Sequence, residues 1–236
     1  KAVLVSIPRD SYALIPEHLN SQGKTIPAAY SKLNSSFNWG GAPLLIETIE
    51  QMTDLKIDHY VEINFVGFAR MVDSLGGIEV CTKKDINDSK SHLVLPAGVH
   101  NLNGIDALKY VRTREFDGLG DIGRMQRQQA FISSVVKKAT SMGVLLNPIT
   151  MTSFINSALS AVTTDEGLNS SDMIVLAKQL KSLSASNVRT LTVPLSDLYY
   201  NANGVTASVL WDPVLAPELW ERLREDRAVV DEVVPS

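Results

Sequence analysis

The order of apolar and polar positions predicts a chain of alternating strands and helices. Residues 2–7 are almost continuously apolar, which is typical of an interior strand covered on both faces. Residues 57–65 alternate between apolar and polar side chains, as expected for a strand with one buried face. Short apolar runs at residues 78–81 and 187–193 predict two further strands.

The same pattern at helical spacing predicts the helices. The segment from residue 8 to about Phe37 is expected to be a loop, and a helix is expected to open at Gly40-Gly41-Ala42-Pro43 and to end near Leu55. Asn64 is suited to cap a helix that Gly76-Gly77 ends. Further helices are predicted at residues 105–111, 121–141, 148–162, 171–183 and 213–224.

Together these elements predict an α/β fold, a three-layer α/β/α sandwich around a mixed central sheet. Because a domain rarely begins with a central strand, we expect the N-terminal strands of the domain to precede Lys1 and to be missing from this chain. With 236 residues, 44% of them hydrophobic, the chain can bury one sizeable core. We therefore predict a single domain over residues 1–228 and a C-terminal tail over 229–236.

Composition narrows the classes of function. The formal net charge of −4 argues against a nucleic-acid partner, because binding to the phosphate backbone usually requires a basic domain or stripe. Cys81 is the one cysteine, which excludes an internal disulfide and a zinc site with several cysteines. The sequence contains no run of 18 apolar residues of the kind that spans a membrane.

A cluster of cations stands out in this acidic chain. Between residues 109 and 127 lie Lys109, Arg112, Arg114, Arg124 and Arg127. If the chain is extended at 112–114, Arg112 and Arg114 project to the same side and can hold one anion together. Arg124, Arg127 and Gln128 can share one face of the next helix, near the N-terminal turns that favour anions.

Arg9 follows the first predicted strand, at the kind of strand end where α/β proteins bind ligands. Arginine holds phosphate oxygens with two donors at once, so a phosphate or pyrophosphate is the natural ligand of this set. The alternative is that Arg9 pairs with Asp10, and Arg124 with Asp121, in solvated surface bridges of little energetic value. The spacing alone favours neither.

Six sequence blocks together resemble the LytR-CpsA-Psr family. In chain order they are Val3 to Asp10, Lys32-Leu33-Asn34 leading to Gly40-Gly41, His59 to Phe65, Val72 to Ile78, Leu102-Asn103-Gly104 through Arg112-Thr113-Arg114, and Asp121 to Gln128. The likeness covers nearly the whole chain, although residues 147–208 follow the family in pattern rather than in motif.

The resemblance implies a membrane-anchored bacterial enzyme on the extracytoplasmic face of the cell membrane, with a single-pass anchor before this chain. The family binds a polyprenyl pyrophosphate, with the tail in an apolar tunnel and the head group held by arginines and Mg²⁺. Carried over to this sequence, the head-group residues are Arg9, Arg112, Arg114, Arg124 and Gln128, with Arg127 as a further candidate. The main acidic metal ligands are expected upstream of Lys1, and Asp10 and Asp121 are weak candidates.

The implied reaction moves a glycan-1-phosphate from the lipid carrier to a hydroxyl of peptidoglycan or of a glycoprotein. Such chemistry depends on positioning and charge neutralisation, so Arg9, Arg112, Arg114 and Arg124 would serve catalysis. The general base would be Asp10, Asp121 or an aspartate upstream of Lys1. Two alternatives stay open, a prenyl pyrophosphate phosphatase and a non-catalytic lipid-binding module. Apolar helix faces, either tunnel wall or ordinary core, lie at Leu44, Leu45, Ile49, Phe65, Phe68 and Val72.

Overall fold

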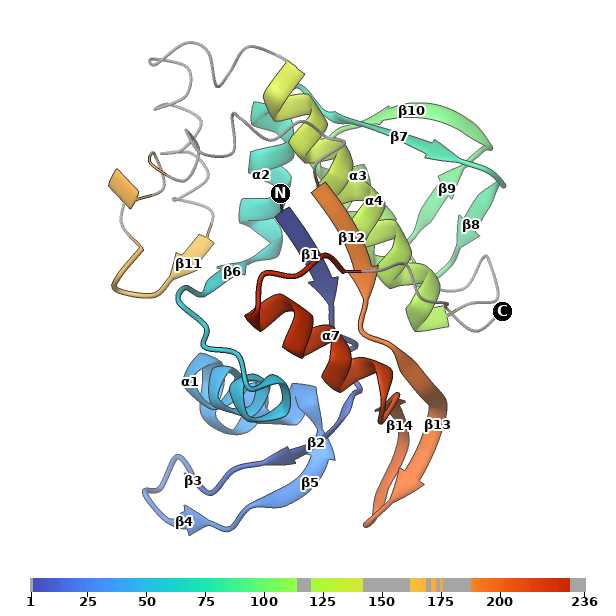
Figure 1. Cartoon of the computed structure of the whole chain (residues 1–236). Helices are drawn as coiled ribbons and strands as arrows, with labels where there is room; N and C mark the ends of the chain where they lie inside the picture. The colour runs from blue at the N-terminus through green and yellow to red at the C-terminus, as the bar shows by residue number, and fades with distance from the viewer. Residues whose placement is uncertain are drawn as a thin grey trace. The chain divides into compact units, whose positions relative to one another are not determined.

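The computed structural model describes residues 2–113, 120–141, 162–168, 171–172, 175 and 188–229 (Figure 1). The chain divides into two compact units. The first comprises Lys1–Leu4 and His59–Thr190, and the second comprises Val5–Asp58 and Leu191–Ser236. Both units combine helices with strands, in agreement with the predicted α/β class. None of the helices in these described ranges is both long and apolar enough to cross a membrane.

In its described residues, the first unit contains the helices α2, α3 and α4 and antiparallel strand pairs. The elements are β6 (Val61–Ile63), α2 (Phe65–Ser74), β7 (Ile78–Thr82), β8 (Ile86–Asp88), β9 (Leu93–Leu95), β10 (Gly98–Leu102), α3 (Gly104–Arg112), α4 (Gly120–Ser141) and β11 (Val162–Thr164). Strand β7 pairs with β10, β8 with β9, and β6 with β11. The predicted helices 105–111 and 121–141 therefore form as α3 and α4.

The core of this unit lies between α2, α3, α4 and the β7–β10 pair. Val72, Leu75, Ile78 and Phe131 are at most 2% exposed and belong to one apolar cluster. Helices α2 and α3 approach so closely that a Cβ atom on Gly104 would lie 2.1 Å from the carbonyl oxygen of Ala69. Glycine is therefore required at the first turn of α3.

Two predictions for this unit need correction. The strand predicted over residues 57–65 shrinks to Val61–Ile63, and its apolar side chains are 46% and 45% exposed rather than buried. Alternation along the sequence indicates which side chains share a face, but an element must cover that face before it is buried. Of the helices predicted at 148–162 and 171–183, residues 162–164 form a strand, Ser171, Asp172 and Val175 are helical, and the others lie outside the described residues.

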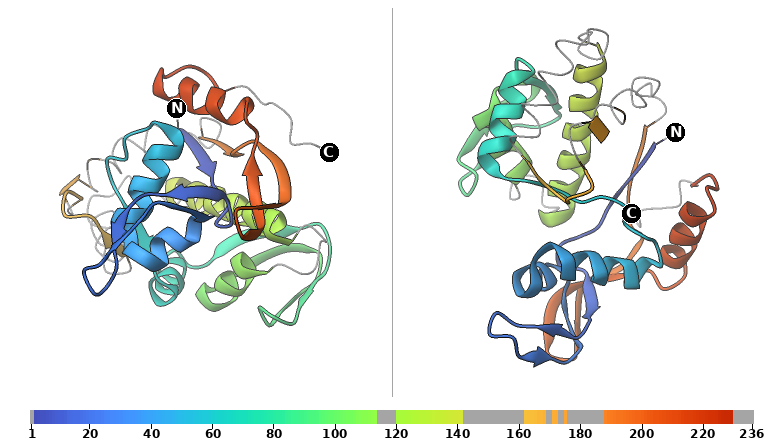
Figure 2. Two further views of the ribbon diagram at one scale, coloured as in Figure 1. Left: turned by 90° about the horizontal axis from the view of Figure 1, so that it is seen from below. Right: turned by 90° about the vertical axis from the view of Figure 1, so that its left-hand side faces the viewer.

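Within its described residues, the second unit contains two β-hairpin ribbons and the helices α1 and α7 (Figure 2). Its elements are β2 (Tyr12–Ile15), β3 (His18–Leu19), β4 (Thr25–Ile26), β5 (Ala29–Lys32), α1 (Leu33–Thr53), β13 (Leu195–Ala202), β14 (Val205–Trp211) and α7 (Leu215–Arg224). The expected loop up to Phe37 is thus wrong, because β2 and β5 pair there and α1 has already begun. Ala13 and Ile15 of β2 are buried under α1. This tertiary contact stabilises the segment as a strand rather than a loop.

The helix start predicted at Gly40-Gly41-Ala42-Pro43 lies inside α1, where the helix is kinked. Gly41 has φ 67° and ψ −156°, values that interrupt the helical backbone inside Leu33–Thr53. Pro43 follows in the first turn after the kink, where its missing N–H costs little. The segment ends at Asp54, whose backbone is left-handed, close to the predicted end at Leu55.

Strand β1 (Ala2–Ser6) pairs with β12 (Val188–Thr192), and both strands run through the boundary between the units. Among the described strands β12 is its one ladder partner, and Val3 is 39% exposed, so β1 is less covered than its apolar sequence predicted.

The β13–β14 hairpin was not predicted, because its register shifts interrupt the alternation along both strands. Helix α7 confirms the predicted closing helix and buries Trp220 in the core of the second unit.

Candidate functional site

The α3–α4 corner of the first unit carries three of the predicted head-group residues, Arg112, Arg127 and Gln128. Two side chains of α4 reach the last carbonyl groups of α3. Arg127 donates a short hydrogen bond from Nη2 to the main-chain oxygen of Thr113, and Gln128 donates from Nε2 to the oxygen of Val111 at 3.1 Å. These carbonyls have no partner within α3, so α4 satisfies the end of the preceding helix.

Arg127 is 7% exposed, and its Nε atom is buried as well. A buried guanidinium that holds a carbonyl group fixes the direction in which the chain leaves α3. Thr113 supports the same corner from the other side, because its hydroxyl donates to the oxygen of Lys109 at 3.0 Å and lies 3.0 Å from Ser91 Oγ. Arg127 and Gln128 therefore have positioning contacts that sequence spacing did not predict.

Arg112, the last residue of α3, is exposed and is positioned by this corner. Its Cζ atom lies 4.8 Å from the centre of the Phe65 ring, a cation–π contact that orients the guanidinium and leaves its N–H edge for a ligand. Thr113 has φ −59° and ψ 139°, so the backbone is extended at this residue, whereas Arg112 is still helical and does not belong to the extended stretch considered for 112–114. Arg114 lies outside the described residues.

Arg124 lies one turn before Gln128 on α4, partly buried. The backbone of Asp121 is in the first turn of the same helix, but its side chain lies outside the described part. The structure thus brings Arg112, Arg127 and Gln128 to one corner, with Arg124 on the adjacent turn of α4.

Arg9 and Asp10 belong to the second unit, where they follow β1. Arg9 Nε lies 3.6 Å from Asp10 Oδ1, and Lys32 Nζ lies 3.9 Å from the same oxygen. The Arg9–Asp10 pairing considered from the sequence therefore forms. The Arg9 side chain is 54% exposed, and contacts of this length in solvent are weak, so its guanidinium is available to an anion.

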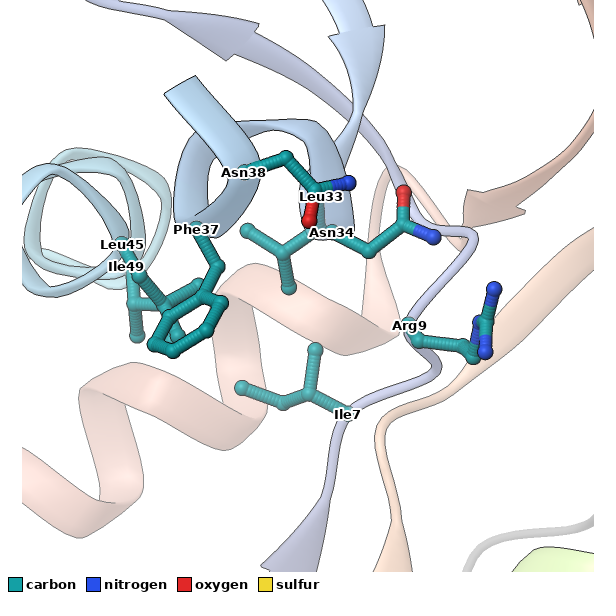
Figure 3. A pocket seen from close by; sticks show the side chains of 8 residues that line it. All are labelled: Ile7, Arg9, Leu33, Asn34, Phe37, Asn38, Leu45 and Ile49. Atoms are coloured by element: carbon teal, nitrogen blue, oxygen red, sulfur yellow. The ribbon is translucent and has the colours of Figure 1, made fainter. Parts of the chain in front are cut away.

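A pocket of about 440 Å³ opens beside Arg9 in this unit (Figure 3). Its wall is lined by Ile7, Arg9, Leu33, Asn34, Phe37, Asn38, Leu45 and Ile49. Figure 3 shows Phe37, Leu45 and Ile49 together on one side and the side chains of Arg9 and Asn34 on the other. The pocket is thus apolar at one end and cationic at the other.

The sequence anticipated only part of this wall. Leu45 and Ile49 were candidate tunnel residues and do line the pocket, whereas Leu44 is 4% exposed and packs in the interior. Phe37 was missed because it was assigned to a loop. The signal that could have found it is the helical spacing of Leu33 and Phe37, four residues apart on the first part of α1.

The described residues do not by themselves make a magnesium site. Mg²⁺ prefers six oxygen ligands in octahedral geometry. Asp10 faces two cations, and no group of three or more acidic, histidine or cysteine side chains suited to a metal occurs in the described part of the chain. Asp10 can contribute at most one of the six ligands that Mg²⁺ requires.

The family model that describes the LytR_cpsA_psr family matches residues 1–212. The chain belongs to this family. Among curated LytR_cpsA_psr relatives, the probable cell wall biosynthesis protein LcpB of Corynebacterium glutamicum is 36% identical over 222 residues, which cover 94% of this chain and 49% of LcpB. The Bacillus subtilis polyisoprenyl-teichoic acid–peptidoglycan teichoic acid transferase TagT is 37% identical over 147 residues, 60% of this chain and 42% of TagT. The chain thus spans about half or less of these proteins.

Solved LytR_cpsA_psr structures share the fold. B. subtilis TagV superposes with a TM-score of 0.75 at 25% identity, covering 95% of this chain and 84% of that one. A structure titled TagT bound to LI-WTA gives a TM-score of 0.70 at 28% identity, covering 96% of this chain and 79% of that one. These likenesses confirm the predicted α/β fold of the family.

Proposed function

We propose that this chain is the catalytic domain of a glycopolymer phosphotransferase, which moves a glycan-1-phosphate from a polyprenyl pyrophosphate carrier to a cell-wall hydroxyl. The observation that carries the proposal is the exposed Arg112 guanidinium, held over Phe65 at a corner that α4 fixes through Arg127. TagT is named a teichoic acid transferase to peptidoglycan, which supports the same class of substrate and acceptor.

In the proposed reaction the acceptor hydroxyl attacks the phosphorus that carries the glycan. A bond forms between the acceptor oxygen and phosphorus, and the bond from phosphorus to the bridging oxygen breaks, so polyprenyl phosphate leaves. Arg112 and Arg124 neutralise the charge that grows on the phosphate oxygens, which is the main catalytic requirement of phosphoryl transfer. Arg9 and Arg114 are proposed to act in the same way, and Asp10 to accept the proton of the hydroxyl.

The pocket beside Arg9 fits the lipid carrier. Its apolar wall at Phe37, Leu45 and Ile49 suits isoprene units, and Arg9 suits the phosphate that follows them. Mg²⁺ belongs to the proposal as a cofactor that would neutralise phosphate charge, held mainly by acidic residues outside this chain. The proposal also places the domain on the extracytoplasmic face of the bacterial membrane, anchored by a segment before it.

The test is calorimetric titration of a prenyl pyrophosphate into this chain and into a version extended upstream, each with and without Mg²⁺. Binding by both, strengthened by Mg²⁺ only in the extended version, is the expected result. Binding by neither would overturn the proposal. A turnover assay then separates the alternatives, because a phosphatase releases phosphate without polymer transfer, and a binding module gives no turnover.

A further inference from the structure

The outer face of the β2–β5 ribbon carries a group of aromatic side chains that the proposed reaction does not use. In the antiparallel register Tyr12 pairs with Lys32 and Leu14 with Tyr30, so these four side chains share one face. The opposite face is buried through Ala13 and Ile15. This face is therefore the exposed side of the ribbon.

Three tyrosine rings form an ordered group on it, here called the tyrosine platform, made of Tyr12, Tyr30 and Tyr200. The rings of Tyr12 and Tyr30 are stacked, with centroids 4.9 Å apart and planes 3° apart. Tyr200 of β13 meets Tyr12 edge-on at 5.0 Å and 75°. Tyr30 is 47% exposed, so a large flat ring surface faces solvent while its neighbours hold it in place.

Polar groups surround the rings. Asn203 donates from Nδ2 to the hydroxyl of Tyr12 at 2.5 Å, which fixes the hydroxyl end of that ring. Across the ribbon, Lys32 lies beside Tyr12 in register and its Nζ is 3.9 Å from Asp10. The platform therefore begins next to the carboxylate that the proposed reaction uses as a base.

We propose that the tyrosine platform binds the pyranose rings of the acceptor glycan, an inference that rests on the proposed function. Sugar rings present C–H groups on their faces and hydroxyls at their edges. The electron-rich face of a tyrosine attracts the C–H groups, and phenol and amide groups exchange hydrogen bonds with the hydroxyls. A glycan on the outer face of Tyr30 would lie on the ribbon face that also carries Lys32, whose Nζ is 3.9 Å from Asp10, where the hydroxyl of the glycan is needed.

A membrane surface fits these observations less well. Peripheral attachment to a bilayer needs an apolar face bordered by several basic residues. Leu14 adds some apolar surface here, but the platform is made mainly of phenol rings with hydroxyl and amide partners, and Lys32 is already shared with Asp10. The observed mixture of flat rings and hydrogen-bonding groups favours a carbohydrate.

The experiment is saturation-transfer NMR of the chain with chitotetraose and with a peptide-free peptidoglycan glycan strand. We expect Tyr30→Ala to weaken glycan binding about tenfold, as for the loss of one stacked ring, and Tyr30→Phe to keep it. Tyr199→Ala is the matched control, since Tyr199 is 78% exposed and joins no ring contact among the described residues. Prenyl pyrophosphate binding should be the same in all three variants.

Equal glycan binding by Tyr30→Ala and the unchanged chain would overturn the inference, and so would no glycan binding at all. Attachment of the chain to phosphatidylglycerol vesicles that Tyr30→Ala abolishes, without glycan binding, would assign the platform to the membrane instead. In the transfer reaction the expected signature is a raised KM for the acceptor with an unchanged affinity for the lipid. Failure of the proposed function would appear separately, as loss of prenyl pyrophosphate binding in the unchanged chain.

Discussion

Arg127 and Thr113 are joined by a hydrogen bond from a buried guanidinium to a buried carbonyl oxygen, across the corner between α3 and α4. This contact gives Arg127 a role different from that of Arg112, although the two arginines belong to the same sequence cluster. Arg127 holds the backbone, and Arg112, one residue before Thr113, is presented to solvent.

Replacement of Arg112 by Ala should weaken prenyl pyrophosphate binding by roughly ten- to a hundredfold, because a charge-assisted hydrogen bond to phosphate is lost. The unfolding transition should stay unchanged, since the side chain is exposed. Calorimetry and thermal unfolding measure the two effects. Arg70→Ala, at an exposed arginine of α2, is the matched control, and equal effects of both variants would remove Arg112 from the site.

Replacement of Arg127 by Met should lower the free energy of unfolding by about 2–4 kcal/mol, because the buried carbonyl of Thr113 loses its donor. Chemical denaturation measures this loss. Gln126→Ala, at an exposed neighbouring position, should change stability by less than about 0.5 kcal/mol. A stable Arg127→Met variant that fails only in pyrophosphate binding would show a direct ligand contact instead.

Replacement of Gly104 by Ala should destabilise the first unit by about 1–3 kcal/mol, because the added methyl group overlaps Ala69 and α3 must move away from α2. The amide of Gly104 also donates to Asp73 Oδ1 at 2.7 Å, and the same movement would strain that bond. Thermal unfolding measures the effect. Ile105→Ala, at a side chain 65% exposed, is the control and should be nearly neutral.

The β6–β11 pair should loosen in acid through Asp165. The hydrogen bond donated by the amide of Tyr60 lowers the pKa of Asp165 below its ordinary 3.8, with His59 and Gly167 adding to the effect. The ionised carboxylate therefore supports the fold above pH 3.8, and this support is lost as pH falls through the lowered pKa of the folded state.

Hydrogen exchange of the Tyr60 amide tests this pH dependence. In the unchanged chain, protection should fall as the solution is acidified below pH 3.8. In Asp165→Asn it should be low at every pH, because the neutral amide is a weaker acceptor. Asp58→Asn, an exposed aspartate in the same stretch, should behave like the unchanged chain. Identical exchange in all three proteins would remove Asp165 from this role.

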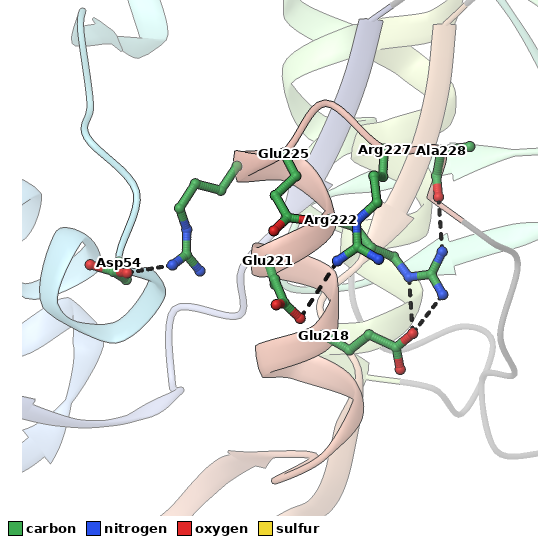
Figure 4. Close-up of polar contacts among 8 residues, drawn as sticks. Asp54, Glu218, Glu221, Arg222, Glu225, Arg227 and Ala228 are labelled. Atoms are coloured by element: carbon green, nitrogen blue, oxygen red, sulfur yellow. Dashed lines mark hydrogen bonds and ion pairs between the residues drawn. The ribbon is translucent and has the colours of Figure 1, made fainter.

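The ion pair between Arg224 and Asp54 should contribute only about 0.2–1 kcal/mol to stability, although its nitrogen and oxygen are 2.5 Å apart (Figure 4). Asp54 is 82% exposed, so solvent screens the pair. A double-mutant cycle with Arg224→Ala and Asp54→Ala measures the coupling. A coupling that persists unchanged in 1 M salt would contradict a screened surface pair.

The sequence by itself determined the family, the α/β class, the arginine cluster and, among the described residues, the helices α2, α3, α4 and α7. Helices α3 and α4 were predictable because their caps and apolar spacing are local properties, which the chain carries wherever it folds. The family could be predicted from the sequence blocks around Arg9 and Arg112, because their residue types and order are specific to it.

Only the tertiary structure decided which arginine of the cluster is buried and which is exposed. Arg127 and Arg112 look equivalent in sequence, and burial against Thr113 separates them. The β2–β5 ribbon and the stacking of Tyr12 on Tyr30 depend on strand pairing across more than a dozen residues, which short-range periodicity does not encode. Burial and pairing are properties of segments distant in sequence that meet in space, so the structure had to supply them.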